Sequence, residues 1–203
     1  DTAALYLEHG GYQHALVIGA ETLSKMMDWT DRSTCVLFGD GAGAAVLSAS
    51  KEDGILSMVQ GSDGFRGDVL NCMARKVNNP YKKSDTALSY VSMNGQEVYR
   101  FAVKTVPKAV TDAVEQAGLQ LEEVDLFLLH QANYRIIEAV SKRLGQPMEK
   151  FPTNLEECGN ISAASVPILL DNVNNHGMMR KGMKIVLAGF GAGLTWGATV
   201  INW

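Results

Sequence analysis

Two stretches of this chain repeat one pattern, in which a short apolar run is followed by a glycine-rich turn and a second apolar run. The first reads HALVIGAE and then FGDGAGAAVLSAS (residues 14–21 and 38–50), and the second reads KIVLAGFGAGLTWGATV (residues 184–200). Such self-similarity indicates two related halves. Because the apolar runs alternate with longer helical patterns, we expect an α/β fold in which two related sheet layers pack through shared helices. Glycine in both turns allows the backbone to approach other backbone, or a ligand, closely.

Hydrophobic periodicity predicts the remaining elements. After an initial helix that ends at Gly10, helices are expected over residues 94–118, 134–144 and 162–173, with Pro107 kinking or breaking the first of these. Strands are expected over residues 14–21, 35–38, 44–48, 124–130, 184–191 and 194–203, and another is expected to begin near residue 55. The polar residues 71–85 and the segment 151–160 are expected to be loops.

The composition sets limits on the class of protein. With 46% hydrophobic and 20% charged residues, the 203 residues can bury one sizeable core or two small ones. A formal net charge of -4 disfavours non-specific binding to nucleic acid. The longest uncharged run, residues 185–203, is interrupted by glycine, so we expect no membrane span. Three widely spaced cysteines fit neither a disulfide framework nor a zinc site, which favours a reducing cytoplasm and no metal.

The first residues already show helical spacing, and the chain begins with Asp1 rather than methionine. No charged segment with a cleavage site accompanies them, so a signal peptide is not expected. We therefore expect this chain to be part of a longer protein.

Two short polar motifs are candidates for chemistry. HQAN (residues 130–133) lies where a predicted buried strand ends and a helix begins, which is where ligands collect in α/β sheets. A helix-capping cluster would explain it equally well. In GNISAAS (residues 159–165), Asn160 lies in the N-cap region of the next predicted helix. Together, His130 and Asn160 could instead donate two hydrogen bonds to one oxygen and stabilise an enolate.

Glycine-rich and basic segments give weaker signals. Neither glycine-rich turn has the spacing of a nucleotide-binding loop, and a backbone N–H between Gly191 and Gly193 could serve as an oxyanion donor. Arg32 is either an anion-binding residue or a solvated arginine beside Asp31. The basic residues that follow HQAN either dock an acidic partner or are merely solvated. They are Arg135, Lys142 and Arg143.

Five segments together closely resemble the β-ketoacyl-acyl carrier protein synthase III family of the thiolase superfamily. They are TDRSTCVLFGDGAGAAVL (30–47), MNGQEVYRFAV (93–103), HQANYRI (130–136), CGNISAASVPILLD (158–171) and GFGAGLTWGA (189–198). The resemblance implies a five-layered α/β/α/β/α thiolase fold with two duplicated halves. Residues 1–50 would complete the N-terminal half, and residues 51–203 would form the C-terminal half.

The resemblance also implies an enzyme, an acyltransferase that initiates fatty acid synthesis. Its reaction would be the decarboxylative Claisen condensation of an acyl-CoA starter, acetyl-CoA foremost, with malonyl-acyl carrier protein. His130 and Asn160 match the family's catalytic histidine and asparagine, and the backbone N–H of Ala192 matches its oxyanion hole, where many relatives have glycine. The nucleophilic cysteine is expected upstream of Asp1, so residues 1–203 alone are expected to be inactive.

Further matches concern the substrates, which are coenzyme A thioesters with no separate cofactor. Arg32 matches a residue that contacts the adenine nucleotide of CoA, and a group near the active site matches the pantetheine tunnel: Gly95, Gln96, Tyr99, Ala132 and Asn133. Another group matches the patch that docks acyl carrier protein: Arg100, Arg135, Lys142 and Arg143. The family also implies a cytoplasmic homodimer.

Three alternatives stay open at the level of sequence. The first is a condensing enzyme of the same fold that uses other starters or serves secondary metabolism. The second is a non-catalytic fragment that only binds CoA or carrier protein. The third is a nucleotide-binding protein that uses the GDGAG turn.

Overall fold

The computed structural model describes residues 1–52, 54–72, 81 and 89–203, and its strands form two principal sheets. The smaller sheet pairs β1 (His14–Thr22) antiparallel with β2 (Asp40–Ser48). The larger sheet has the order β3-β8-β7-β6, with β3 at Ile55–Ser62, β8 at Thr195–Asn202, β7 at Lys184–Gly191 and β6 at Leu126–Leu129. In it, β6 and β7 are parallel and the other neighbours are antiparallel. A short third pair joins β4 (Leu70–Asn71) and β5 (Ser92–Met93).

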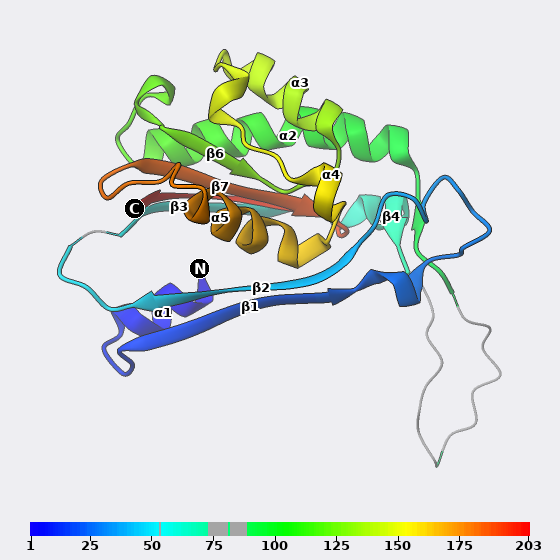
Figure 1. Ribbon diagram of the computed structural model, residues 1–203, viewed down its shortest axis with the longest axis horizontal. Helices are drawn as coiled ribbons and strands as arrows, with labels where there is room; N and C mark the ends of the chain where they lie inside the picture. Colours follow the sequence, from blue (N-terminus) through cyan, green and yellow to red (C-terminus); the bar gives the residue numbers. More distant parts are fainter. Residues whose placement is uncertain (53, 73–80, 82–88) are drawn as a thin grey trace.

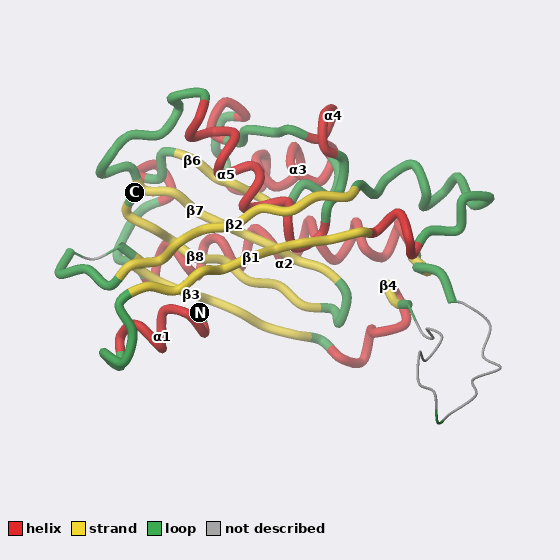
Figure 2. Tube along the Cα trace, turned by 60° about the horizontal axis from the view of Figure 1, so that its bottom comes forward, coloured by secondary structure: helices red, strands yellow, loops and turns green. Residues whose placement is uncertain are grey.

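The sheets alternate with layers of helices (Figure 1). On the outer face of the large sheet lie α2 (Gly95–Gln116) and α3 (Tyr134–Leu144), and α5 (Ser165–Asn175) lies between the two sheets. The short helix α1 (Thr2–Glu8) enters beside β1, and Figure 2 shows β1 and β2 in front of the large sheet. The described residues thus form four successive layers of the expected five: helix, sheet, helix and sheet.

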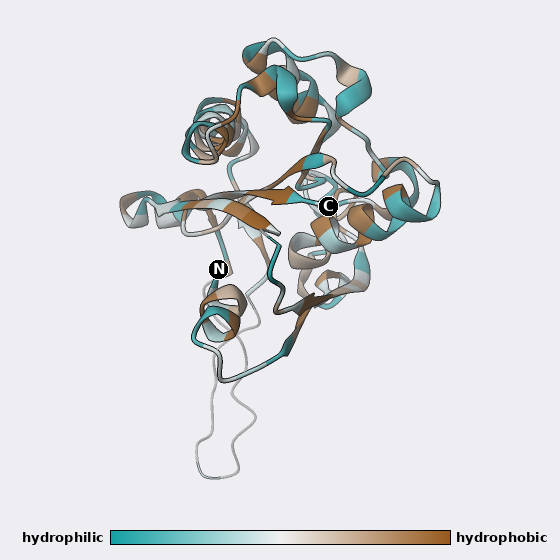
Figure 3. Cartoon of the chain, turned by 90° about the vertical axis from the view of Figure 1, so that its left-hand side faces the viewer, coloured by the Kyte–Doolittle hydropathy of each residue, from teal (hydrophilic) through white to brown (hydrophobic). Residues whose placement is uncertain are grey.

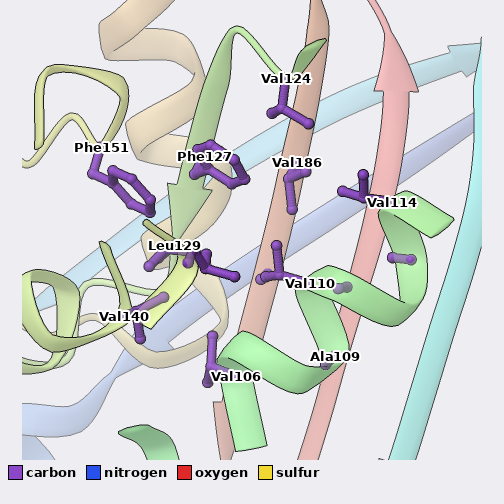
Figure 4. Close-up of a cluster of buried hydrophobic side chains, with 14 of the residues drawn as sticks. Val106, Ala109, Val110, Val114, Val124, Phe127, Leu129, Val140, Phe151 and Val186 are labelled. Atoms are coloured by element: carbon purple, nitrogen blue, oxygen red, sulfur yellow. The ribbon is translucent and has the colours of Figure 1, made fainter. Parts of the chain in front are cut away.

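The main core lies between the large sheet and the helices α2 and α3 (Figure 4). Val106, Ala109 and Val110 of α2 face Phe127 and Val186 of the sheet, and all five side chains are buried. Three buried alanines of α2 belong to this core: Ala102, Ala109 and Ala113. Figure 3 shows brown, hydrophobic stretches along the strands. On the opposite face of the sheet, α5 contributes to a second apolar cluster, which comprises Leu126, Leu128, Leu169, Val173, Met179 and Ile185.

The repeated sequence pattern corresponds to two antiparallel strand pairs, one in each sheet. The correspondence extends to register, because Gly19 lies opposite Gly43 in the first pair and Gly189 lies opposite Gly197 in the second. The prediction of two related sheet layers joined through a shared helix is therefore confirmed. The boundary predicted near residue 50 falls in the connection between β2 and β3, and the division into two halves stays a prediction.

The glycine-rich segment FGDGAG is not a turn between two strands, as the sequence suggested. Residues 34–37 form a turn, and β2 runs through the glycines from Asp40 onward. A Cβ at Gly19 would lie 2.4 Å from the carbonyl oxygen of Ala163, and one at Gly43 would lie 2.9 Å from the backbone nitrogen of Ile168. The missing side chains let the turn before α5 and the first residues of α5 lie directly on the strands. Protein backbone therefore occupies the space directly beside Gly19 and Gly43.

The structure differs from the sequence predictions in two further segments. The expected break at Pro107 is wrong, since α2 continues unbroken through this residue. The predicted loop over residues 151–160 contains a single helical turn, α4 (Leu155–Cys158). Most of the loop predicted over residues 71–85 lies outside the described residues. None of the helices described is both long and apolar enough to span a membrane.

Candidate active site

A cavity of about 1330 Å³ opens where β6 and β7 end. Its walls come from segments far apart in the chain: the turn before β2, the first turns of α2, the β6–α3 connection, the segment after α4, the end of β7 and the start of β8. His130, Asn160 and Ala192, the three residues predicted to handle the reacting oxygen, all line it.

His130 follows the last residue of β6 and is only 9% exposed. Its backbone N–H donates to the carbonyl of Ala188 over 2.7 Å, which continues the pairing with β7. The imidazole meets the ring of Phe190 edge-on, with centroids 5.3 Å apart and planes at 76°. Burial disfavours the charged form and lowers the pKa of His130 from 6.5 to about 4. At neutral pH the ring is therefore uncharged and carries one N–H donor.

The side chain of Asn160 is held through its oxygen, and its amide nitrogen bonds to no described residue. Its side-chain Oδ1 accepts a hydrogen bond from the backbone N–H of Ser162 over 3.0 Å, and only the carbonyl end of the amide can do this. Within the described part of the chain, Nδ2 makes no hydrogen bond. The backbone is fixed by the turn before β2, because Asn160 N donates to Leu37 O and Gly39 N donates to Asn160 O. Asn160 does not cap α5 itself, since a 3-10 turn (Ser162–Ala164) comes first, but its bond to the Ser162 N–H satisfies the first backbone donor of that turn.

The third candidate donor is the main chain at Ala192, just beyond β7. Among the described residues, Ser162 is the only non-glycine residue with a positive φ, so alanine is unstrained at position 192. The hydroxyl of Thr195 donates to the carbonyl of Ala192 over 2.9 Å and holds this turn. Cβ atoms at Gly189 and Gly191 would meet nothing within 4 Å, so these glycines border open space rather than packed backbone. The two copies of the glycine pattern thus have different surroundings.

The residues predicted for the pantetheine tunnel gather on the walls of this cavity. Gly95, Gln96 and Tyr99 come from the start of α2, and Ala132 and Asn133 come from the β6–α3 connection. The capping explanation of HQAN holds for Asn133, whose Oδ1 accepts from the backbone N–H two residues later over 2.8 Å and begins α3. It does not hold for His130.

Arg32 stands apart from these residues. It is exposed and does not line the cavity, although its neighbour Ser33 does. The carboxylate of Asp31 accepts hydrogen bonds from Ser33 and Thr34, which lowers the pKa of Asp31. Within the described residues, Arg32 forms no ion pair with it. Its predicted contact with CoA stays a prediction.

The four predicted docking residues differ in their surroundings. Arg100 is paired with Glu97, which also pairs with Arg66 at 3.3 Å. Lys142 is paired with Glu138 at 2.8 Å, and this contact raises the pKa of Lys142. Arg135 and Arg143 are exposed and have no ion pair with any described residue. Of these two, Arg135 lines the cavity.

The sequence predicted no role for an aromatic cluster that contacts the His130 ring through Phe190. Phe101 meets Phe190 at 6.2 Å and Trp196 at 5.8 Å between ring centroids, and the Arg66 guanidinium lies 5.9 Å from the Phe101 ring centroid. Gly61 leaves space for the Trp196 ring of this cluster, since a Cβ at Gly61 would lie 2.4 Å from that ring. The signal in the sequence was the pair of aromatic residues in the second glycine-rich motif.

Of the three free cysteines, Cys72 lines the cavity and Cys35 and Cys158 do not. The thiol of Cys72 is 3.3 Å from the carbonyl oxygen of Ser89 and donates to it. Among the described residues, no group of three or more His, Cys, Asp or Glu side chains could hold a metal ion.

The layers and the site together define a thiolase-like α/β protein, and comparison with known proteins narrows the class. Residues 1–64 match the family model for 3-oxoacyl-acyl-carrier-protein (ACP) synthase III, and residues 114–203 match the model for its C-terminal part. The chain is 48% identical, over its whole length, to beta-ketoacyl-acyl-carrier-protein synthase III of Clostridium acetobutylicum. The chain therefore belongs to the β-ketoacyl-acyl carrier protein synthase III family.

Solved structures agree with this assignment. The synthase III from Thermus thermophilus superposes with a TM-score of 0.89 at 43% identity, covering 100% of this chain and 63% of that one. The priming β-ketosynthase of the R1128 polyketide pathway superposes with a TM-score of 0.89 at 37% identity, covering 98% and 60%. The chain spans 63% of the length of the Clostridium acetobutylicum relative.

Proposed function

We propose that these residues supply the enolate-stabilising side of a condensing enzyme. The enzyme would join an acyl-CoA starter, acetyl-CoA foremost, to malonyl-acyl carrier protein and so initiate fatty acid synthesis. One observation carries the proposal: a buried, uncharged histidine lines one cavity together with an asparagine whose amide nitrogen bonds to no described residue. Two neutral donors suit a reaction in which negative charge develops on an oxygen only in the transition state.

The proposed chemistry has two half-reactions. The sulfur of a cysteine thiolate first attacks the acyl-CoA carbonyl, the bond to the CoA sulfur breaks, and CoA leaves as its thiolate, which takes up a proton from solvent. Malonyl-acyl carrier protein then loses carbon dioxide, and the electrons of the broken C–C bond form an enolate. His130 and Asn160 donate to the enolate oxygen. The enolate carbon attacks the acyl-enzyme carbonyl, whose developing charge is met by the N–H of Ala192, and the cysteine thiolate departs.

The nucleophile is proposed to lie outside residues 1–203. A second cavity of about 410 Å³, bordered by Asp1 and Thr2, shares Val166, Gly189 and Trp196 with the wall of the main cavity. This continuity supports delivery of a cysteine from a segment beside the N-terminal helix. It follows that residues 1–203 alone form no acyl-enzyme and catalyse no condensation.

The proposed partners follow from the cavity walls. The pantetheine arm of either substrate would pass between the start of α2 and the β6–α3 connection. Acyl carrier protein, an acidic partner, would dock with Arg135 as the principal contact, supported by Arg100, which also lines the cavity, and by Lys142 and Arg143 in the last turn of α3. Arg32 would meet the nucleotide end of CoA. We further propose a homodimer located in the cytoplasm.

A test in the full-length protein separates the two half-reactions. His130→Ala and Asn160→Asp are each expected to lower malonyl decarboxylation by about 10²- to 10³-fold, the usual cost of one oxyanion donor. Transfer of acetyl from acetyl-CoA to the enzyme should persist. Asn160→Asp keeps an oxygen for the Ser162 N–H, so its folding should be unaffected. Unchanged decarboxylation in both variants would contradict the proposal.

A second candidate is a priming enzyme for other products, favoured by the likeness to the R1128 priming β-ketosynthase. A panel of acyl-CoA starters of increasing length decides between them. Preference for acetyl-CoA supports initiation of fatty acid synthesis, and preference for a longer or branched starter supports the second candidate.

A further inference from the structure

Gln131 is fully buried beside His130, and both ends of its amide are used. Its Nε2 donates to the carbonyl of Leu129 over 2.8 Å, and its Oε1 accepts from the backbone N–H of Asn154 over 3.2 Å. An amide is costly to bury without partners, and here the protein satisfies both its donor and its acceptor.

The two partners of Gln131 belong to the two segments that carry the proposed donors. Leu129 is the last residue of β6 and precedes His130. Asn154 precedes α4, whose single turn leads through Gly159 to Asn160. Among the described residues, the bond from Asn154 to Gln131 is the only hydrogen bond between residues 130–133 and residues 151–162.

We propose that Gln131 is a positioning residue that fixes the separation of the His130 and Asn160 donors. The proposal rests on the proposed function above. Two donors on separate loops act on one oxygen only if the loops keep their spacing, and a displacement of about 1 Å can cost as much as 10²-fold in rate. Gln131 sets that spacing without itself lining the cavity.

The test is Gln131→Met in the full-length protein, which keeps the length of the side chain and removes both hydrogen bonds. We expect kcat for malonyl decarboxylation to fall by about 10- to 100-fold, with KM and acetyl transfer from acetyl-CoA within about twofold of the unsubstituted enzyme. A merely structural loss would lower both half-reactions together. Should Gln131→Met fail to fold, Gln131→Asn keeps an uncharged amide on a side chain one methylene shorter, which cannot hold both hydrogen bonds at once. It should show the same selective fall in decarboxylation.

Gln146→Met is the matched control. Gln146 is also a buried glutamine, and its amide donates to Glu122 over 3.3 Å, but it lies beyond the far end of α3 and does not line the cavity. Its replacement should lower the melting temperature without changing the ratio of the two half-reactions.

A second variant tests whether Gln131 acts through the donors. In an Asn160→Ala background, Gln131→Met should cost less than about threefold, because the partner it positions is gone. The same large loss in that background, equal losses in both half-reactions, or the same split with Gln146→Met would overturn the inference. If the unsubstituted enzyme does not decarboxylate malonyl-acyl carrier protein, the proposed function fails, and the inference fails with it.

Discussion

At the scale of single residues, the proposed site depends on groups that are polar but uncharged. Burial keeps the His130 imidazole neutral, and the bond from Ser162 turns the nitrogen of Asn160 away from the backbone. The sequence identified both residues and their shared chemistry. It did not reveal Gln131 or Phe190 as their supports, because those roles depend on contacts between segments distant in the chain.

The lowered pKa of His130 predicts a pH dependence of stability. Below pH 6.5 this histidine binds a proton in the unfolded chain. In the folded protein it stays uncharged until the pH nears 4. The free energy of unfolding should therefore fall as the pH drops through this window, by roughly 2–3 kcal/mol from this group. Urea unfolding at pH 7 and pH 4.5 measures the loss.

His130→Gln should remove that part of the loss, and replacement of the exposed His9 should leave it in place. An identical pH dependence in His130→Gln and the unsubstituted protein would show that His130 is not buried in its neutral form.

At the scale of elements, the sequence predicted most helices and strands but misread the glycine-rich strand β2. Local rules assign FGDGAG to a turn because glycine weakens strands. In the fold, tertiary packing decides: the glycines of β1 and β2 form the surface on which the turn before α5 and the first residues of α5 lie. Tertiary packing also explains why α2 continues through Pro107, since the apolar face of this helix is buried along the length of the helix.

This packing predicts a large cost for a single added methyl group. Gly19→Ala would place a Cβ 2.4 Å from the carbonyl oxygen of Ala163, so strand and helix must separate. We expect a loss of about 1–3 kcal/mol in the free energy of unfolding, as for other overpacked sites. Gly11→Ala, where a Cβ meets nothing within 4 Å, is the control. Equal stability of the two variants in a denaturant titration would refute the close packing.

The charges on α3 predict selective loss of one substrate. Arg135→Glu should weaken use of malonyl-acyl carrier protein at least about tenfold, because Arg135, which pairs with no described residue and lines the cavity, would become an anion facing the proposed acidic partner. Use of acetyl-CoA should change far less. Lys142→Glu should have a smaller effect, because Glu138 already pairs with Lys142. Steady-state kinetics with each substrate varied in turn make the comparison, and equal loss of both substrates would rule out docking at Arg135.

At the scale of the whole molecule, the repeated sequence pattern predicted the two sheet layers and the helix between them. The resemblance in sequence then identified the family to which the comparisons assign the chain. What sequence alone could not supply was the convergence of distant segments on one cavity. Arg32 is an example of this limit. The motif around it matches the family, but Arg32 is not among the residues that line the cavity.

Residues 1–203 are proposed to stabilise the enolate, while a cysteine from elsewhere in the protein carries the acyl group. Incubating the full-length protein with acetyl-CoA, digesting it and locating the acetyl group by mass spectrometry tests this claim most directly. We predict one acetyl thioester on a cysteine outside these 203 residues. Acetyl on Cys72, which shares the cavity with His130, or on Cys35 or Cys158, would contradict the account.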